Sequence, residues 1–471
     1  MIRQFLVYAY VTFFCFYSFK DWYKSLCALI LMAGVIQHPD MPRTLFGIQG
    51  LSPWNMLLFF VILGFCIRKS AEAILWDMPS KVTIIFVVYL LVIFVSTIRM
   101  MSDLSGVIDW AIINNNELPT FKRLISEYFI NTIKWMIPGI LIFYGCKSDK
   151  RFLITITSII GLYFIYAIQI IRWVPLSAIA GGESLGKLAG KLLQNEIGIN
   201  RDTLSMMMAG AFWASFIFKD FIKKSLLRFL AIFVSFALFL AQALTGGRAG
   251  YVSWIACGFI IGTVKYKKYL LLIPLILFIG LNFIPGVKQR VFTGVHQEYV
   301  SEVSEFEKQY IYNGINFYEV TSGRIVAWPY VIEKIKENPI WGYGREAMKR
   351  TGIASYLWLN FRESFPHPHN MYLQFLLDNG IIGFVPVIIF YFIVLKWSYS
   401  LFRKKNYPYC VIAGSISFSL TLAYLIGGLG SQYFYPVEES LGRWCAIFLM
   451  FRVYKEYEKK NFSFISQEPF I

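Results

Sequence analysis

Two of the four histidines in this chain lie in its most distinctive motif, Pro-His-Pro-His-Asn at residues 366–370, where a long polar stretch meets a strongly apolar one. A neutral imidazole accepts a proton near neutral pH, so a histidine at such a junction suits general-base catalysis. We expect His369 to be the base, supported by His367 and Asn370, and the sequence leaves open which histidine takes the proton. A histidine that only caps the interface is the structural alternative.

The same two histidines, spaced two apart, would lie on one side of an extended loop and so suggest a metal site. Zinc and related ions take three or four protein ligands, and no other Asp, Glu, Cys or His has a matching spacing. The seven cysteines lie within or at the ends of apolar runs, which is typical of core residues. We therefore predict a site with no metal and no cofactor.

Two glycine-flanked arginines supply positive charge. Arg248 lies in Thr-Gly-Gly-Arg-Ala-Gly, residues 245–250, between two apolar runs, and Arg324 follows Thr-Ser-Gly, residues 321–323, at the start of a helical pattern. Arginine near the apolar phase is costly unless it meets an anion, and helix N-termini also attract anions. We predict that both arginines bind one diphosphate. The plainer alternatives are a tight turn with Arg248 reaching the lipid headgroups and a solvated Arg324.

The elements that position these residues must be membrane helices. A mean hydropathy of +0.55, with 57% hydrophobic and 15% charged residues among 471, is too apolar for a soluble protein. The apolar runs are long and uniform, which favours helices over a barrel. They fall near residues 4–19, 22–36, 54–67, 82–98, 133–146, 152–171, 203–218, 226–244, 250–264, 269–285, 371–395, 409–428 and 439–453.

Charge orients these spans. The formal charge of +17 is spread over short loops between the runs, which disfavours nucleic acid as a partner. Basic loops at 147–151, 219–224, 265–268 and 403–405 fall on one side, so that side is expected to be cytoplasmic and the long stretch 286–370 external. No small-residue cleavage site follows the first run, which we expect to be retained.

The predicted fold is therefore an all-α polytopic membrane protein with one large, partly helical external loop before its last three spans. Its parts are an N-terminal transmembrane bundle at residues 1–285, the loop domain at 286–370, and C-terminal spans with a cytoplasmic tail at 371–471. If residues 1–36 form one broken span, the total is about twelve. Thirteen spans with an external N-terminus are the alternative.

Three motifs in this order resemble the O-antigen ligase family: Thr-Gly-Gly-Arg-Ala-Gly, then Ser-Gly-Arg with a downstream Asn-Pro-Ile-Trp-Gly-Tyr-Gly, then Pro-His-Asn-Met-Tyr-Leu with a later Gly-Ile-Ile-Gly. The resemblance assigns the family's histidine to His369 and its two arginines to Arg248 and Arg324. Residues 197–201, with Asn200 and Arg201, are similar to a less distinctive family segment. Asp378 departs from the family's more frequent glutamate.

The resemblance implies a metal-independent, inverting glycosyltransferase in the bacterial inner membrane, with its active site on the periplasmic side. Its donor would be a preassembled O-antigen on undecaprenyl diphosphate and its acceptor a hydroxyl of lipid A-core, as in lipopolysaccharide biosynthesis. Arginines would stabilise the departing diphosphate at low dielectric. Sugars would stack on loop aromatics, for which Trp328, Trp341, Tyr343 and Trp358 are candidates, although packing is the stronger expectation for each.

Two other functions remain open at this point. An O-antigen or exopolysaccharide polymerase would use the same lipid-linked donor and the same arginines, and would differ only in its acceptor. A lipid-linked glycan flippase or transporter is also large and polytopic, but transporters carry charged or helix-breaking residues at mid-membrane and inverted repeats. Here the candidate residues gather at one predicted face instead, which favours the ligase.

Overall fold

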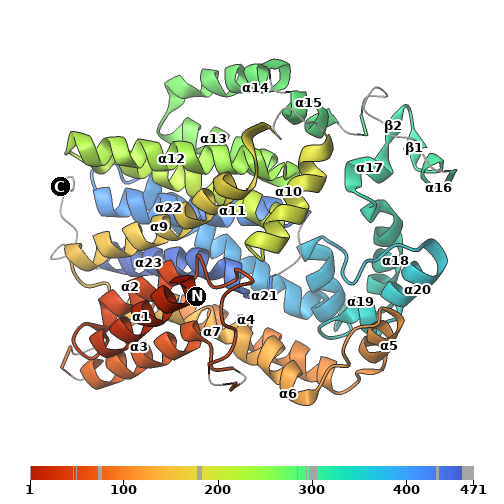
Figure 1. The fold of residues 1–471 in the computed structure, drawn as a ribbon, viewed down its shortest axis with the longest axis horizontal. Coiled ribbons are helices and arrows are strands. Elements are labelled where there is room, and N and C mark those ends of the chain that lie inside the picture. The colour runs from red at the N-terminus through yellow and green to blue at the C-terminus, as the bar shows by residue number, and fades with distance from the viewer. Residues whose placement is uncertain are drawn as a thin grey trace.

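The structure, a computed structural model, describes residues 2–45, 47–48, 50–69, 71–72, 77–177, 183–283, 285–292, 294–295, 305–430 and 434–458. Helices make up nearly all of its regular structure (Figure 1). The only sheet in those ranges is the antiparallel pair β1 (Ile311–Tyr312) and β2 (Ile315–Asn316). The predicted mostly helical class is therefore confirmed, with one small strand pair added. Residues 459–471, most of the predicted cytoplasmic tail, lie outside the described ranges.

Each of the thirteen apolar runs contains a helix. These are α1 (Ile2–Tyr17), α2 (Trp22–Met32), α3 (Pro53–Lys69), α4 (Ser80–Met101), α8 (Ile137–Gly145), α9 (Asp149–Trp173), α11 (Arg201–Phe218), α12 (Ser225–Thr245), α13 (Arg248–Val264), α14 (Leu272–Phe283), α21 (Met371–Phe402), α22 (Pro408–Gly427) and α23 (Leu441–Glu458).

Five helices in the described ranges, α4, α9, α12, α21 and α22, are long and apolar enough to cross a bilayer. The shorter apolar helices α2 and α13 accompany them. These helices support a multi-pass membrane protein, and the number of spans stays a prediction. The first two helices form an antiparallel hairpin, in which the Tyr10 hydroxyl donates to the Ala28 carbonyl and Ser25 Oγ to that of Phe14. This arrangement differs from one broken span.

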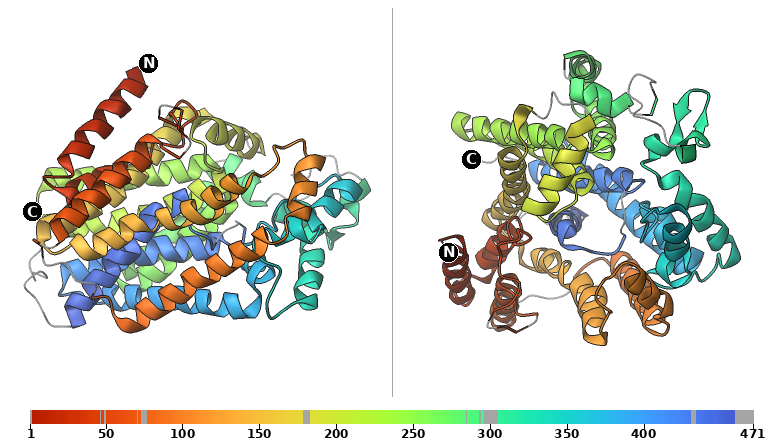
Figure 2. Two further views of the ribbon diagram at one scale, coloured as in Figure 1. Left: turned by 90° about the horizontal axis from the view of Figure 1, so that it is seen from below. Right: turned by 45° about the vertical axis from the view of Figure 1, so that its right-hand side comes forward.

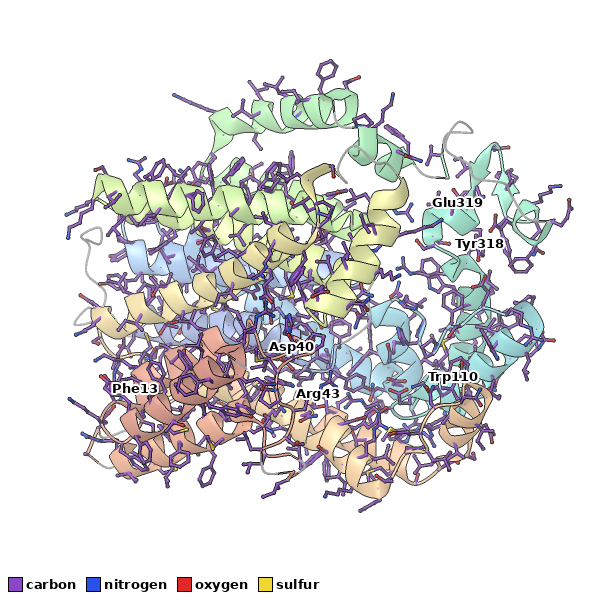
Figure 3. The ribbon with its side chains drawn as sticks, viewed as in Figure 1. Phe13, Asp40, Arg43, Trp110, Tyr318 and Glu319 are labelled. Atoms are coloured by element: carbon purple, nitrogen blue, oxygen red, sulfur yellow. The ribbon has the colours of Figure 1, made fainter. Side chains whose placement is uncertain are left out.

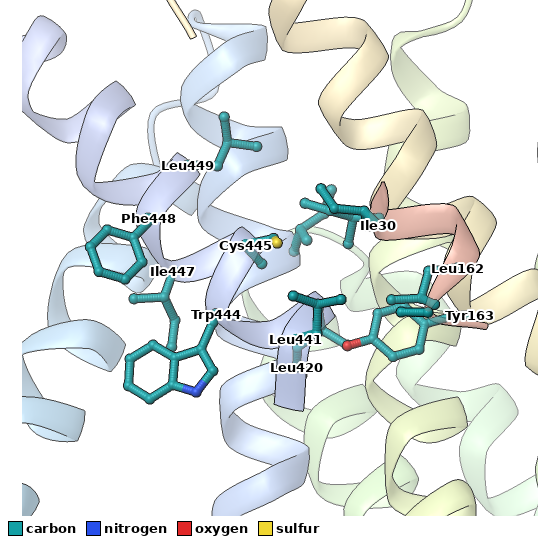
Figure 4. Close-up of a cluster of buried hydrophobic side chains, with 14 of the residues drawn as sticks. Ile30, Leu162, Tyr163, Leu420, Leu441, Trp444, Cys445, Ile447, Phe448 and Leu449 are labelled. Atoms are coloured by element: carbon teal, nitrogen blue, oxygen red, sulfur yellow. The ribbon is translucent and has the colours of Figure 1, made fainter. Parts of the chain in front are cut away.

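The bundle core forms around α11, which packs against α12, α13 and α22. Small residues allow the close approach: a side chain at Gly210 of α11 would meet the backbone of Leu420 in α22. Beside it, Trp444 and Cys445 of α23 are fully buried together with Tyr163 of α9 and Ile30 of α2 (Figure 4). Large aromatic and small side chains thus pack together across these three helices.

The segment before α21 forms a second, smaller core at one end of the long helices (Figure 2, left). Its elements are α15 (Pro285–Phe292), α16 (Glu305–Lys308), the two strands, α17 (Phe317–Thr321), α18 (Arg324–Glu337), α19 (Ala347–Arg350) and α20 (Ile353–Phe361).

Trp110 of α5 (Ser105–Ile113), which belongs to the predicted N-terminal bundle, joins this core beside α19 and α20 (Figure 3). The domain boundary at residue 286 stays a prediction, since the packing crosses it.

Shorter elements complete the fold. They are α6 (Phe121–Leu124), the π-helix η1 (Ile125–Ile130), α7 (Asn131–Lys134), α10 (Glu183–Glu196), and the 3-10 turns η3 (Lys219–Phe221), η4 (Lys267–Leu271) and η6 (Glu438–Ser440).

Candidate active site

Arg248 begins α13, directly after a tight turn whose glycines the packing requires. Gly246 ends α12 in the left-handed region, at φ +64°, which favours glycine. A side chain at Gly247 or Gly250 would collide with Ser205 of α11, and Ser205 Oγ donates to the Gly247 carbonyl at 3.0 Å. The motif at residues 245–250 therefore holds the start of α13 against α11, which fixes the origin of the Arg248 side chain.

The Arg248 side chain reaches from the bundle to the loop. Its Nη2 donates to the Glu319 carbonyl and to Ser322 Oγ, both at 2.9 Å. Glu319 lies in α17, next to Tyr318 (Figure 3). In the described ranges these bonds occupy Nη2 alone, so the rest of the planar guanidinium stays available to an anion.

Arg324 is also positioned by a tight turn that precedes a helix. Ser322 and Gly323 are both left-handed, at φ +52° and +79°, and α18 begins at Arg324 immediately afterwards. Its Nη2 donates to the carbonyl of Gly430, just beyond α22, at 3.0 Å. The loop domain and the C-terminal spans therefore meet at this side chain. The sequence prediction of a helix N-terminus at Arg324 is confirmed.

The two histidines lie on the loop that leads into α21. Their rings are 4.2 Å apart, and the Phe365 ring contacts His369 edge-on at 5.9 Å. His369 takes a left-handed conformation, at φ +49°, that is uncommon for a side chain of this size. Trp328 of α18 donates its indole N–H to the Pro368 carbonyl at 3.0 Å, which ties this loop to the helix that Arg324 begins.

Asn370 has a structural role in this arrangement. Its Oδ1 accepts from the backbone N–H groups of Tyr372 and Leu373, at 3.0 and 3.1 Å, and so caps α21. The N–H of Met371 also donates to the Gly428 carbonyl at the end of α22. The histidine loop is thus anchored at the first turn of the span that follows it.

The charge of Arg324 acts on both of the other candidate side chains, Arg248 and His369. Burial, and then the positive charge of Arg324, lowers the pKa of His369 to about 4, so its imidazole is neutral at pH 7. Burial and the neighbouring His369 lower the pKa of His367 further. Arg324 also lies near enough to Arg248 for their charges to interact. The structure therefore gathers Arg248, Arg324 and His369 at one end of the helices, as the sequence predicted.

Asn200 and Arg201 lie at the edge of this cluster, at the start of α11. Asn200 caps the helix by accepting from the Asp202 N–H at 2.8 Å, and Arg201 pairs with the Asp202 carboxylate at 3.8 Å. The Asp202 charge acts on His369 and on both predicted diphosphate ligands, Arg248 and Arg324. Sequence reasoning missed Asp202, although an acid in the first turn of the Asn200 helix was a visible signal.

The aromatic candidates divide by position. Trp341 is 61% exposed, and Trp328 holds the histidine loop as described. Tyr343 and Trp358 pack against the smaller core, as the packing alternative expects. Within the described ranges, no three His, Cys, Asp or Glu residues gather in a way that could hold a metal. A metal-free site remains a prediction.

Asp378 and Gly380 stabilise the loop that precedes them. The Asp378 carboxylate is buried, and accepts from the Tyr435 hydroxyl at 2.9 Å and the Ala347 N–H at 3.1 Å. Gly380 is left-handed, at φ +58°, and its Cα faces the backbone of Ile340 and Trp341. In the same motif, Gly383 allows α21 to pack closely against α4, since a side chain there would meet Val92. Gly380 instead packs against the Asn-Pro-Ile-Trp-Gly turn.

Comparison with known proteins agrees with this geometry. Residues 230–388, which carry both arginines and both histidines, match the family described as O-antigen ligase. This segment is an O-antigen ligase domain. The O-antigen ligase domain begins inside α12 and ends inside α21, so it includes the smaller core except for Trp110 of α5. Asn200, Arg201 and Asp202 precede it in the chain.

Two curated relatives match parts of the chain. An "Uncharacterized protein" of Haemophilus influenzae is 28% identical over 192 residues, which is 38% of this chain and 46% of that protein. A "Putative polysaccharide ligase" of Rickettsia conorii is 32% identical over 121 residues, or 24% of this chain and 27% of that protein. The matched regions span less than half of either relative. They support a ligase or polymerase type of membrane function around the O-antigen ligase domain.

Proposed function

We propose that this protein is an inverting, metal-independent glycosyltransferase of the inner membrane. It transfers a preassembled O-antigen glycan from undecaprenyl diphosphate to a hydroxyl of lipid A-core at the periplasmic face. The observation that carries the proposal is the gathering of two guanidinium groups and a neutral imidazole at one end of the helices.

The arginines bind the diphosphate of the donor. Breakage of the bond between the anomeric carbon and the diphosphate oxygen leaves an electron pair, and so a further negative charge, on the departing undecaprenyl diphosphate. Among the residues that the structure describes, Arg248 and Arg324 each donate through Nη2 alone, so their remaining N–H groups are preorganised for phosphate oxygens. Such fixed donors stabilise the leaving group without reorganisation at the moment of reaction.

His369 activates the acceptor. Its neutral imidazole takes the proton of the attacking hydroxyl as the new carbon–oxygen bond forms on the face opposite the diphosphate, and this single displacement inverts the anomeric carbon. Arg324 favours the neutral imidazole before reaction. The charge of Arg324 also makes His369 a weaker base. This disadvantage is offset during the reaction, because the negative charge that develops on the diphosphate neutralises Arg324 as the proton moves to His369.

A deletion strain tests the reaction, with the polymerase as its rival. We expect intact lipid A-core without attached polymer, together with accumulated lipid-linked polymer. Lipid A-core capped with single repeat units would instead indicate a polymerase. Purified protein that forms product in detergent, without a gradient or sealed vesicles, would exclude the flippase.

A further inference from the structure

A large cavity opens at the same end of the bundle as the candidate active site, and the proposed mechanism does not use it. Its volume is about 1130 Å³, and its wall includes Gln37, Arg43, Trp54 and Asn55, residues of η1 and α7, and Gly198 and Glu438. Gly198 lies two residues before Asn200, and Glu438 follows the segment whose Gly430 holds Arg324. At these two points the cavity wall is therefore close in sequence to residues beside the arginine and histidine cluster.

The wall combines a tryptophan floor with amide and amine groups. The rings of Trp54 and Trp135 lie 4.4 Å apart, and both are nearly inaccessible to solvent. Lys134 lies 4.5 Å above the Trp135 ring and donates to Asn55 Oδ1 at 3.3 Å. Asn131 is one turn earlier on the same wall. Apolar side chains, among them Met41, Ile48 and Leu51, line other parts of the wall.

Glu438 gives the strongest sign of a ligand. Its Oε1 is inaccessible to solvent and accepts no hydrogen bond within the described ranges. The neighbouring Gln37 side chain donates to Glu439 at 3.4 Å. A buried carboxyl oxygen without a partner is costly, and natural proteins rarely leave one unless a bound group completes it. The cavity wall is thus prepared for a ligand that carries hydrogen-bond donors.

The charged groups around Glu438 indicate what kind of hydrogen-bond donor the ligand carries. Burial and the adjacent Glu439 raise the pKa of Glu438 to about 8, while Lys134 and Arg43 act in the opposite direction. At neutral pH the carboxyl is therefore largely protonated, with two basic groups nearby. A cationic ligand would meet Lys134 and Arg43 unfavourably. A neutral, polyhydroxylated ligand matches a carboxyl, amides and an ammonium together.

We propose that this cavity is a carbohydrate-binding subsite that holds sugar residues of a glycan substrate. The inference rests on the proposed glycosyl transfer. The volume lies slightly above the roughly 300–1,000 Å³ of ligand pockets and accommodates more than one sugar ring. Sugar hydroxyls donate to Glu438 Oε1 and accept from Lys134 and Asn131. The sugars belong either to the donor glycan or to the acceptor core.

Kinetics of Glu438→Met and Asn131→Leu in the full-length protein test the subsite. Both changes keep side-chain size while removing hydrogen bonds, and Glu333→Met on the exposed face of α18 is the matched control. We expect KM to rise about tenfold for one substrate, with kcat nearly unchanged, as for the loss of one hydrogen bond to a buried group. The substrate affected, donor or acceptor, identifies the source of the sugars.

Direct binding separates this inference from the proposed function. The probes are core oligosaccharide, and core with attached O-antigen, released from the host lipopolysaccharide by mild acid. Wild-type protein in detergent should bind at least one of them, and both variants should bind about tenfold more weakly at an unchanged melting temperature. Equal binding by wild type and variants, or a fall in kcat alone, would overturn the subsite. Saturable binding by a protein without transferase activity would overturn only the reaction.

Discussion

The imidazole rings of His367 and His369 lie 4.2 Å apart, with their planes inclined at 54°. Two rings at this distance repel each other when both are protonated, and burial lowers the pKa of each, so both are neutral at pH 7. His367 is the weaker base of the two, because burial and His369 both lower its pKa. His369, whose pKa falls less, is therefore the better candidate to accept a proton.

Replacement of each histidine separates their roles. We expect His369→Ala to reduce transfer by about 10²- to 10⁴-fold, the usual contribution of a general base, while His367→Ala retains most of the activity. Banding of lipopolysaccharide on a gel measures both, with membrane insertion checked by immunoblot. Normal long-chain bands with His369→Ala, or their loss with His367→Ala alone, would contradict the assignment.

Arg324→Lys should impair transfer although the charge is kept. Lysine has one nitrogen, which cannot both donate to Gly430 and contact the diphosphate in a bidentate manner. We expect kcat/KM to fall by about 10²-fold, as for the loss of one fixed donor to developing charge. Lys336→Arg, on an exposed part of the same helix, serves as the control. A wild-type rate from Arg324→Lys would argue against bidentate binding.

The acid limb of the pH profile should respond to Asp202. Activity requires neutral His369, so it is present at high pH and lost as the pH falls through the pKa of about 4. Asp202 raises this pKa and Arg324 lowers it. Asp202→Asn should therefore move the acid limb of kcat/KM to lower pH, and Arg324→Gln should move that of its residual activity to higher pH. Shifts of the same sign in both variants would be inconsistent with the structure.

The glycine turn can be tested by protein stability. Gly250→Ala adds a methyl group against Ser205, and we expect it to destabilise the protein by about 1–3 kcal/mol. Gly280→Ala in α14 is the matched control, since a side chain there meets nothing within 4 Å. Thermal denaturation in detergent gives the comparison, and the double variant with Ser205→Gly should recover part of the loss. Equal melting temperatures for the two alanine variants would refute the packing argument.

Hydropathy alone located the thirteen helices, because a long apolar run in lipid has few alternatives to a helix. The order of the motifs and the alternation of the loops also placed Arg248, Arg324 and His369 at one end. The role of Trp328 was not accessible, since its hydrogen bond to Pro368 depends on how α18 packs. The contact of Gln37 with Glu439 joins positions 402 residues apart, and no local pattern specifies such a pairing.

The bond from Arg248 to Glu319 and Ser322 has a consequence for protein engineering. Arg248 on α13 donates to the Glu319 carbonyl in α17 and to Ser322 before α18, so the predicted loop domain depends on a residue of the predicted bundle. A hybrid protein that exchanges only residues 286–370 with a related protein would combine the Ser322 turn of one protein with Arg248 of the other. A crossover point before α12 would take Arg248 and this turn from the same protein. We expect hybrids of this kind to retain activity.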